Sequence, residues 1–279
     1  MKIAVLAASG QLGRRVVSSL LDRGVAPADI VAGVRTPAKA HDLAALGVQV
    51  RAADYDDPAT VQRALAGVER ALIIPSKAPP APRVVQHQNA VYAAGAAGVK
   101  HLVFSGIVGT RPETPSAIVP FLLYAESSLR TSGMTWTLLR NSLYADEIVD
   151  WVPDILRMGT IPYPTGDGRT AYVHRDDIAR ATAAVLATDG HDGQIYELTG
   201  PESLTTSDLC DAVARATGQP VVGTDATDAD YLKACEGSGQ SAFITQILLS
   251  LYHVIEGGHF DVCTDHIERL TGQPATSFE

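Results

Sequence analysis

The sequence has little cysteine, no long apolar run and no excess of positive charge. Three of its 279 residues are cysteine, and their spacing matches no zinc pattern: Cys210, Cys235 and Cys263. This odd number predicts neither a disulfide framework nor a metal site, and it indicates a reduced, cytoplasmic protein. The formal net charge of −9 makes the surface as a whole repel polyanions, so we expect no nucleic-acid partner.

Membrane spans and export signals are not expected either. No apolar run approaches the length needed to cross a bilayer, and the first residues enter a strand-like segment without the cleavage site of a signal peptide. Hydrophobic residues make up 46% of the chain and charged residues 19%, which is typical of a globular protein with a buried core. The length of 279 residues favours one core domain with a smaller appendage.

Short strand-like runs alternate with alanine-rich helical stretches through the first half of the chain. Most runs are apolar with little polar alternation, as in a parallel sheet that is covered on both faces. We expect strands at 3–6, 30–34, 48–52, 71–74, 101–104 and 136–139, and helices at 10–21, 38–46, 58–66, 83–97 and 121–131. This alternation predicts an α/β fold with a Rossmann-type doubly wound parallel sheet.

The pattern changes after Asn141. We expect helices at 143–158, 175–187 and 206–217, the last capped by Thr205 or Thr206, with short strands at 171–173 and 195–198 and a mostly helical remainder. Residues 1–141 are therefore predicted to form a Rossmann domain. Residues 142–279 are predicted to form a smaller C-terminal α/β cap that binds substrate, with segments that return to the core. A charge-assisted pair of Arg175 and Asp177 is expected to anchor this cap.

The segment from Ala7 to Gly13 follows the first strand and opens the first helix, which is the context of a dinucleotide-binding turn. Gly10 lets the backbone approach a pyrophosphate, Gly13 lets the helix pack close to the sheet, and Ser9 and Gln11 can add hydrogen bonds. The helix N-terminus offers unpaired N–H groups. Ala7 replaces the first glycine of the usual spacing, so we expect ordinary dihedral angles there. A tight turn without a ligand is the alternative interpretation.

The end of the second strand favours NADPH over NADH. NAD-selective enzymes often place an acid there for the ribose 2′-hydroxyl, whereas this chain has Arg35, followed by Thr36 and, one turn on, by Lys39. A planar guanidinium suits a 2′-phosphate in bidentate geometry. A solvated surface arginine is the alternative.

Six segments together resemble one family in their order and spacing. They are Ser9-Gly10-Gln11-Leu12-Gly13, residues 34–40, Ala53-Asp54-Tyr55, residues 94–100, residues 137–141 and residues 270–274. The chain resembles an atypical short-chain dehydrogenase/reductase of the NmrA-like group over nearly its whole length. Within that group it is most similar to NAD(P)H:quinone oxidoreductases and triphenylmethane reductases.

The resemblance implies a role for each matching position. It places Gly10, Gln11, Leu12 and Gly13 at the pyrophosphate, Arg35 at the 2′-phosphate, Asp54 and Tyr55 near the adenine, Ile74, Pro75 and Ser76 at the nicotinamide ribose, Ser105 and Gly106 beside the nicotinamide, and Asn141, Ser142, Leu143 and Tyr144 at the edge that closes the site. All of these positions follow predicted strands, where open α/β sheets bind ligands.

The usual catalytic pair of the wider superfamily, Tyr-x-x-x-Lys, is missing. Tyr124 has Ser128 at the lysine position, and Leu122 stands where similar quinone reductases often carry histidine. A quinone needs less help than a ketone, because the anion formed by hydride addition is stabilised and solvent can protonate it. Tyr144 and His174 are the candidate proton donors or orienting residues. The alternatives are a Tyr144 packed on the cap and a His174 satisfied by Asp176 or Asp177.

We therefore expect an NADPH-dependent reductase of a quinone-like or conjugated small molecule that can form a homodimer. Two alternatives stay open: a redox-inactive NADP(H)-binding regulator, and a biosynthetic reductase of an aromatic polyketide-like substrate. We interpret His87 as an ordinary structural residue of a helix and not as a ligand. Trp151 and the run at 248–252 form either an apolar pocket wall or plain core.

Overall fold

The computed structural model describes residues 1–76, 78–236 and 239–278. Within these ranges seven strands form one parallel sheet in the order β3-β2-β1-β4-β5-β6-β7. The strands are β1 (Ile3–Leu6), β2 (Ile30–Val34), β3 (Gln49–Ala52), β4 (Arg70–Ile73), β5 (His101–Ile107), β6 (Thr135–Asn141) and β7 (Gln194–Leu198). The strand order with helical crossovers confirms the predicted doubly wound α/β fold.

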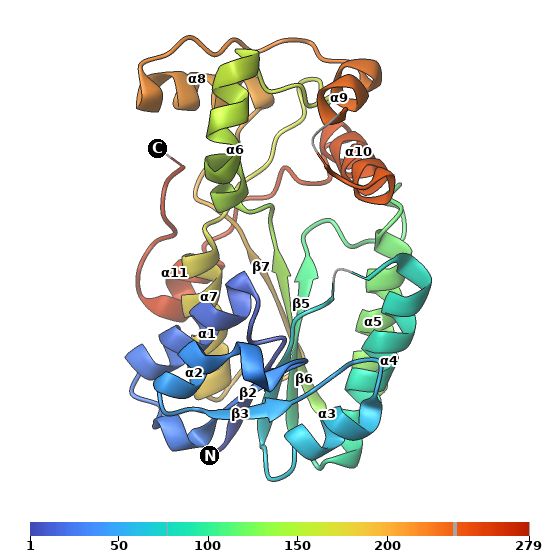
Figure 1. The fold of residues 1–279 in the computed structure, drawn as a ribbon, viewed down its shortest axis with the longest axis vertical. Helices are drawn as coiled ribbons and strands as arrows, with labels where there is room; N and C mark the ends of the chain where they lie inside the picture. The colour runs from blue at the N-terminus through green and yellow to red at the C-terminus, as the bar shows by residue number, and fades with distance from the viewer. Residues whose placement is uncertain (77, 237–238, 279) are drawn as a thin grey trace.

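Helices cover both faces of this sheet (Figure 1). One face carries α1 (Gln11–Asp22), α2 (His41–Ala45), α7 (Arg175–Ala187) and α11 (His266–Thr271), and the other carries α3 (Pro58–Ala64), α4 (Pro80–Ala96) and α5 (Val119–Arg130). In the described part of the chain, no helix is long and apolar enough to span a membrane.

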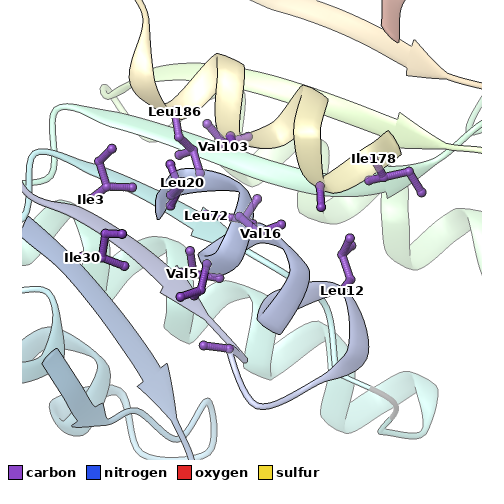
Figure 2. Close-up of a cluster of buried hydrophobic side chains, with 14 of the residues drawn as sticks. Ile3, Val5, Leu12, Val16, Leu20, Ile30, Leu72, Val103, Ile178 and Leu186 are labelled. Carbon is purple, nitrogen blue, oxygen red and sulfur yellow. The ribbon is translucent and has the colours of Figure 1, made fainter. Parts of the chain in front are cut away.

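Strand β1 shows how the sequence fixes the two layers. Its side chains alternate, so that Ile3 and Val5 join the core under α1 and α7, whereas Ala4 and Leu6 join the core under α3 to α5. All four side chains are fully buried, and each large aliphatic contributes about 2 kcal/mol of burial free energy. Figure 2 shows the first of these cores, to which α1 and α7 contribute Leu12, Val16, Leu20, Ile178 and Leu186. The packing holds α1 directly behind the end of β1.

The second half of the chain contributes to both the sheet and a cap. Strand β7 pairs in parallel with β6, and α7 packs against α1, so both belong to the sheet layers. The cap consists of α6 (Ala145–Met158), α8 (Thr206–Thr217), α9 (Asp228–Cys235) and α10 (Ala242–Glu256), which gather beyond the carboxyl ends of the strands (Figure 1). It has its own core, in which Tyr163 stacks on Tyr252 at 4.5 Å between ring centroids. The division at residue 141 stays a prediction.

Three local predictions differ from the structure. The helix expected at 38–46 is a 3₁₀ turn at Pro37–Lys39 followed by α2, because Ala40 leaves the helical conformation with φ −119° and ψ 38°. Residues 171–173 form no strand, and only isolated bridges involve this segment, such as the one between Val173 and Tyr144. The remainder after 217 is less helical than expected, because residues 220–227 and 261–264 are irregular.

Candidate active site

The carboxyl ends of the parallel strands meet at one edge of the sheet, below the cap (Figure 1). Each segment to which the resemblance gives a role lies at or just after such an end. These segments are 9–13 after β1, 35–39 after β2, 54–55 after β3, 74–76 after β4, 105–106 near the end of β5 and 141–144 at the end of β6. The fold therefore brings the predicted positions to a common edge.

The turn after β1 has a strained residue that the sequence did not predict. Ala7 adopts a φ of +57°, so the expectation of ordinary dihedral angles at this position was wrong. The turn must reverse the chain between β1 and α1. Two hydrogen bonds hold it there, from the Gly10 N–H to the Ala7 carbonyl at 3.0 Å and from the Ala8 N–H to the Gly33 carbonyl at 3.0 Å. A left-handed conformation costs an alanine about 1–2 kcal/mol, which the surrounding structure must offset.

Gly13 is required because α1 packs so closely on this turn. A Cβ atom at Gly13 would lie 2.6 Å from the Ala7 carbonyl oxygen and 2.7 Å from the Ala8 Cα atom. Both contacts are with backbone, so they cannot be relieved by a side-chain rotation. At Gly10 a Cβ atom would come to 3.3 Å from the same oxygen. The predicted close approach of helix and strand is confirmed.

The N-terminus of α1 is free to bind an anion. Gly10 is the N-cap residue, no side chain of the described residues caps the helix there, and the first turn carries no acidic residue. The first N–H groups of a helix have no partner within it, and they carry partial positive charge toward the sheet edge. The cradle at Gly13 and these uncapped N–H groups fit the pyrophosphate of a dinucleotide.

At the end of β2, Arg35 and Lys39 are both exposed. Neither side chain has a hydrogen-bond or ion-pair partner within the ranges that the structure describes. The Gly33 carbonyl, two residues before Arg35, accepts the hydrogen bond from Ala8 and so joins the end of β2 to the turn. Two unpaired cations therefore lie beside the phosphate-binding turn, which fits the additional phosphate of NADPH.

Tyr55 connects the ends of β3 and β4. Its hydroxyl donates to the Ile74 carbonyl at 3.0 Å, and Asn89 of α4 donates to the Tyr55 carbonyl at 2.8 Å. Burial raises the pKa of the Tyr55 hydroxyl. The side chain is thus a buried strut, whereas Asp54 before it is only half-buried.

A polar chain that we did not anticipate borders the end of β4. Gln86 of α4 donates a hydrogen bond to Asp56 at 2.8 Å, and its side-chain oxygen accepts one from the Ser76 hydroxyl. The run Gln86-His87-Gln88-Asn89 was the available signal, but the helix pattern alone did not show which of its side chains face the sheet edge. His87 is fully buried, and neither ring nitrogen has a hydrogen-bond partner among the described residues. Burial lowers its pKa to about 4, with a smaller effect of Arg83.

The ends of β5 and β6 form the buried floor of the edge. Asn141 donates to the Ser105 hydroxyl at 3.0 Å, and both side chains are buried. The other amide atom, Asn141 Oδ1, and the neighbouring Ser142 Oγ have no hydrogen-bond partner in the described structure. Buried polar atoms without a partner are costly, so these two fit a site that is completed by a polar ligand.

Tyr144 lies at the start of α6, under a buried arginine. The Arg175 guanidinium lies 4.2 Å from the ring centroid and pairs with Asp146 at 3.2 Å and Glu147 at 2.5 Å. Burial raises the pKa of the Tyr144 hydroxyl, and smaller opposing effects come from a hydrogen bond with Asn141 and from Arg175. The phenol is therefore better suited to donate a hydrogen bond than to give up its proton.

Two expected side-chain contacts differ from those observed. Arg175 pairs with α6 and not with Asp177, whose carboxylate instead accepts from the Thr276 N–H at 2.6 Å and pairs with Arg180 at 2.5 Å. The carboxylate near His174 belongs to Asp146, with 3.4 Å between His174 Nδ1 and the oxygen, and not to Asp176 or Asp177. The start of α7 is thus anchored to α6 through Asp146, a contact between segments that sequence spacing does not reveal.

The positions of the usual superfamily pair lie elsewhere. Tyr124 is exposed, and its hydroxyl accepts a hydrogen bond from Gln88 of α4. Leu122 is buried in the core of the cap. On the same helix, α5, the buried Glu126 accepts two hydrogen bonds of 2.9 and 2.7 Å from Arg140 of β6. This ion pair fixes α5 to the sheet.

The cap contains a cavity of about 800 Å³ between α6 and the segment around α9. Trp151, Met158, Tyr163 and Tyr231 line it, whereas Leu249, Leu251 and Tyr252 of the run at 248–252 are buried core. No cluster of three His, Cys, Asp or Glu side chains that could hold a metal ion occurs within the described ranges.

Comparisons with known proteins agree with this geometry. A family model described as NAD(P)H-binding matches residues 7–189. Quinone oxidoreductase 2 of Escherichia coli is 36% identical over 99% of this chain and 95% of its own length. The NAD(P)H azoreductase of Xenophilus azovorans is 31% identical over the same shares.

Solved structures are similar over the whole chain. The NADPH complex of the Escherichia coli NADPH-dependent quinone oxidoreductase has a TM-score of 0.93 at 34% identity, and it covers 99% of this chain and 96% of that one. The Citrobacter sp. triphenylmethane reductase with NADP(H) has a TM-score of 0.93 at 31% identity, with 100% and 98% covered. The strained turn, the cradle at Gly13 and these matches lead to one conclusion: the chain belongs to the NAD(P)H-binding family.

Proposed function

We propose that the protein is an NADPH-dependent reductase that transfers hydride to a quinone-like or otherwise conjugated small molecule. One observation carries the proposal: the uncapped N-terminus of α1, held against β1 at Gly13, lies beside the unpaired cation Arg35. The first feature suits a pyrophosphate and the second a 2′-phosphate. Relatives named for quinone, azo and triphenylmethane reduction support the choice of acceptor.

We assign the cofactor contacts to the residues of the sheet edge. The assignment is Ser9, Gly10, Gln11, Leu12 and Gly13 for the pyrophosphate, Arg35 and Lys39 for the 2′-phosphate, Asp54 and Tyr55 for the adenine side, Ile74, Pro75 and Ser76 for the ribose, and Ser105, Gly106 and Asn141 for the nicotinamide. Support comes from the strand ends on which they lie and from the unpaired Asn141 Oδ1. Because the Tyr55 hydroxyl is already bonded to Ile74, we assign Tyr55 a packing contact only.

The chemistry of a conjugated acceptor fits the side chains at this edge. NADPH, when bound, supplies a hydride from its nicotinamide ring. A quinone that accepts the hydride becomes a hydroquinone anion, and a proton from solvent completes the reduction. The site therefore needs no strong acid, which agrees with the missing Tyr-x-x-x-Lys pair. We assign Tyr144 the role of hydrogen-bond donor to the acceptor, because burial raises its pKa, and keep His174 as the second candidate.

A redox-inactive regulator that binds NADP(H) is the second candidate function. The observation that favours it is Leu122, which is buried in the cap core at the position where similar quinone reductases often carry histidine. A regulator of this kind binds both oxidised and reduced cofactor without turnover.

We place the protein in the cytoplasm and infer that it can form a homodimer. The low cysteine usage supports the compartment. Val85 and Tyr92 on α4 and Tyr124 on α5 are exposed and apolar, which supports self-association. Sedimentation velocity over a range of concentrations tests the oligomeric state.

A turnover panel separates the two candidate functions. The purified protein is mixed with NADPH or NADH and with quinones, azo and triphenylmethane dyes, enones and polycyclic aromatic ketones. The reductase predicts NADPH oxidation that depends on the acceptor and exceeds the rate with NADH. Tight NADPH binding without oxidation by any acceptor would establish the regulator instead, and turnover with aromatic ketones alone would favour the biosynthetic alternative.

A further inference from the structure

Arg14 connects the phosphate-binding turn to the helix after β2. It lies in the first turn of α1, where its Nε donates to the Ser9 carbonyl at 2.9 Å. Its guanidinium also forms an ion pair with Asp42 of α2. The side chain thus folds back toward the turn and connects it to α2, the helix that follows Lys39 in the chain.

The adjacent arginine on the same helix points elsewhere. Arg15 donates to the Gln11 carbonyl at 3.1 Å and pairs with Asp176 of α7 at 2.9 Å. It therefore lies on the side of α1 that faces α7, away from the end of β2. The two arginines have similar exposure, 36% for the Arg14 side chain and 34% for Arg15, so they form a matched pair that differs in direction.

We propose that Arg14 is a further ligand of the cofactor 2′-phosphate and that Asp42 is its counter-ion in the free protein. This inference rests on the proposed function, because it presumes that NADPH binds at this edge. The phosphate replaces the Asp42 carboxylate on the guanidinium, and Arg14 then closes over the phosphate opposite Arg35 and Lys39. Asp42 lowers the preference for the 2′-phosphorylated cofactor, because its carboxylate competes for Arg14 with a 2′-phosphate but not with a ribose 2′-hydroxyl.

The exchange is favourable on charge and geometry. The Asp42 side chain is 57% exposed, and ion pairs between exposed groups contribute little, so the existing pair opens readily. A phosphate offers up to two negative charges and three acceptor oxygens, whereas the carboxylate offers one charge and two. Arg14, Arg35 and Lys39 together supply three cations, whereas the competing Asp42 supplies one negative charge.

Binding of two small nucleotides tests the proposal without turnover. Calorimetry measures the dissociation constants of adenosine 2′,5′-bisphosphate and adenosine 5′-monophosphate for the wild type, R14Q, R14K, D42N, the R14Q/D42N double variant and the control R15Q. We expect R14Q to weaken the bisphosphate about tenfold and the monophosphate less than about twofold. R14K should lose less, because it keeps the charge without the planar fork. R15Q should leave both constants within about twofold.

Asp42 gives the second half of the test. D42N should strengthen bisphosphate binding several-fold in the wild-type background and by a smaller factor in R14Q, since the competitor matters most while Arg14 is present. Equal weakening of both nucleotides by R14Q would mean that Arg14 only supports the turn through Ser9, and the proposal would be wrong. Weaker bisphosphate binding in D42N would also overturn it. A wild type that binds neither nucleotide would instead refute the cofactor assignment on which the proposal rests.

Discussion

Replacing His87 with leucine should remove a large part of the acid sensitivity of folding. The imidazole is fully buried on α4, with its ring 5.4 Å from that of Phe104 between centroids, and both ring nitrogens lack a partner in the described structure. Burial holds its pKa at about 4, against 6.5 for an exposed histidine. His87 therefore binds a proton more weakly in the folded protein than in the unfolded chain.

The magnitude follows from the difference between the two pKa values. Because the folded pKa is the lower one, the unfolded state gains its proton first as the pH falls below 6.5. Each pKa unit corresponds to about 1.4 kcal/mol, so His87 should cost about 3 kcal/mol of unfolding free energy between pH 6.5 and 4. Burial also lowers the pKa values of His101 and His191, which adds a loss of the same sign.

Urea unfolding followed by circular dichroism measures this effect at a series of pH values from neutral to about pH 4. His87→Leu should lose about 3 kcal/mol less than the wild type over this range, and at neutral pH it should be at least as stable, because leucine leaves no buried polar atom unpaired. His41→Leu, on the exposed surface of α2, serves as the matched control and should keep the full wild-type loss. A pH profile of His87→Leu that is parallel to the wild type would refute the reasoning.

Three further changes test the turn and the sheet. Gly13→Ala should destabilise the fold by about 2 kcal/mol and weaken NADPH binding, because its Cβ would lie 2.6 Å from the Ala7 oxygen. Urea unfolding and calorimetry measure the two effects, and unchanged binding would contradict the assignment of this turn to the pyrophosphate. Ala7→Gly should relieve the positive φ of +57° and, after the greater entropy of the unfolded chain is subtracted, stabilise by up to about 1 kcal/mol in thermal melts; a clear loss of stability would mean that the residue is not strained. Arg140→Met should cost about 3 kcal/mol of unfolding free energy, because Glu126 is 3% exposed and its remaining ion-pair partner among the described residues is Arg130 at 3.6 Å. Arg130→Met, on the exposed side of the same carboxylate, should cost much less.

Local patterns predicted the elements whose boundaries depend on nearby residues. The strand at Ile30–Val34 and the helix at Arg175–Ala187 have the expected bounds, and Thr205 caps α8 by bonding the Asp208 N–H as the spacing indicated. An apolar run and a helix cap each depend on residues that are close together in the sequence, so both can be recognised without knowledge of the fold. The convergence of the predicted site segments followed from the same source, because parallel strands place their ends together.

The features that were missed depend on contacts between distant segments. The positive φ of Ala7 results from α1 packing on β1, and the partner of Arg175 lies on α6 at Asp146, which no spacing rule connects to α7. Likewise, only the packing of α4 on β5 shows that His87 has no partner. The assignments of Tyr144 and His174 depend on such contacts and stay predictions.

The most direct test of the central claim is a stoichiometric reaction of the purified protein with NADPH and a simple benzoquinone in the absence of oxygen. The account predicts that one hydroquinone forms for each NADPH consumed, and that Arg35→Gln raises the KM for NADPH at least about tenfold while the kinetics with NADH change little. NADPH that binds but is not oxidised by any quinone, or an Arg35→Gln variant that still prefers NADPH as strongly as the wild type, would contradict it.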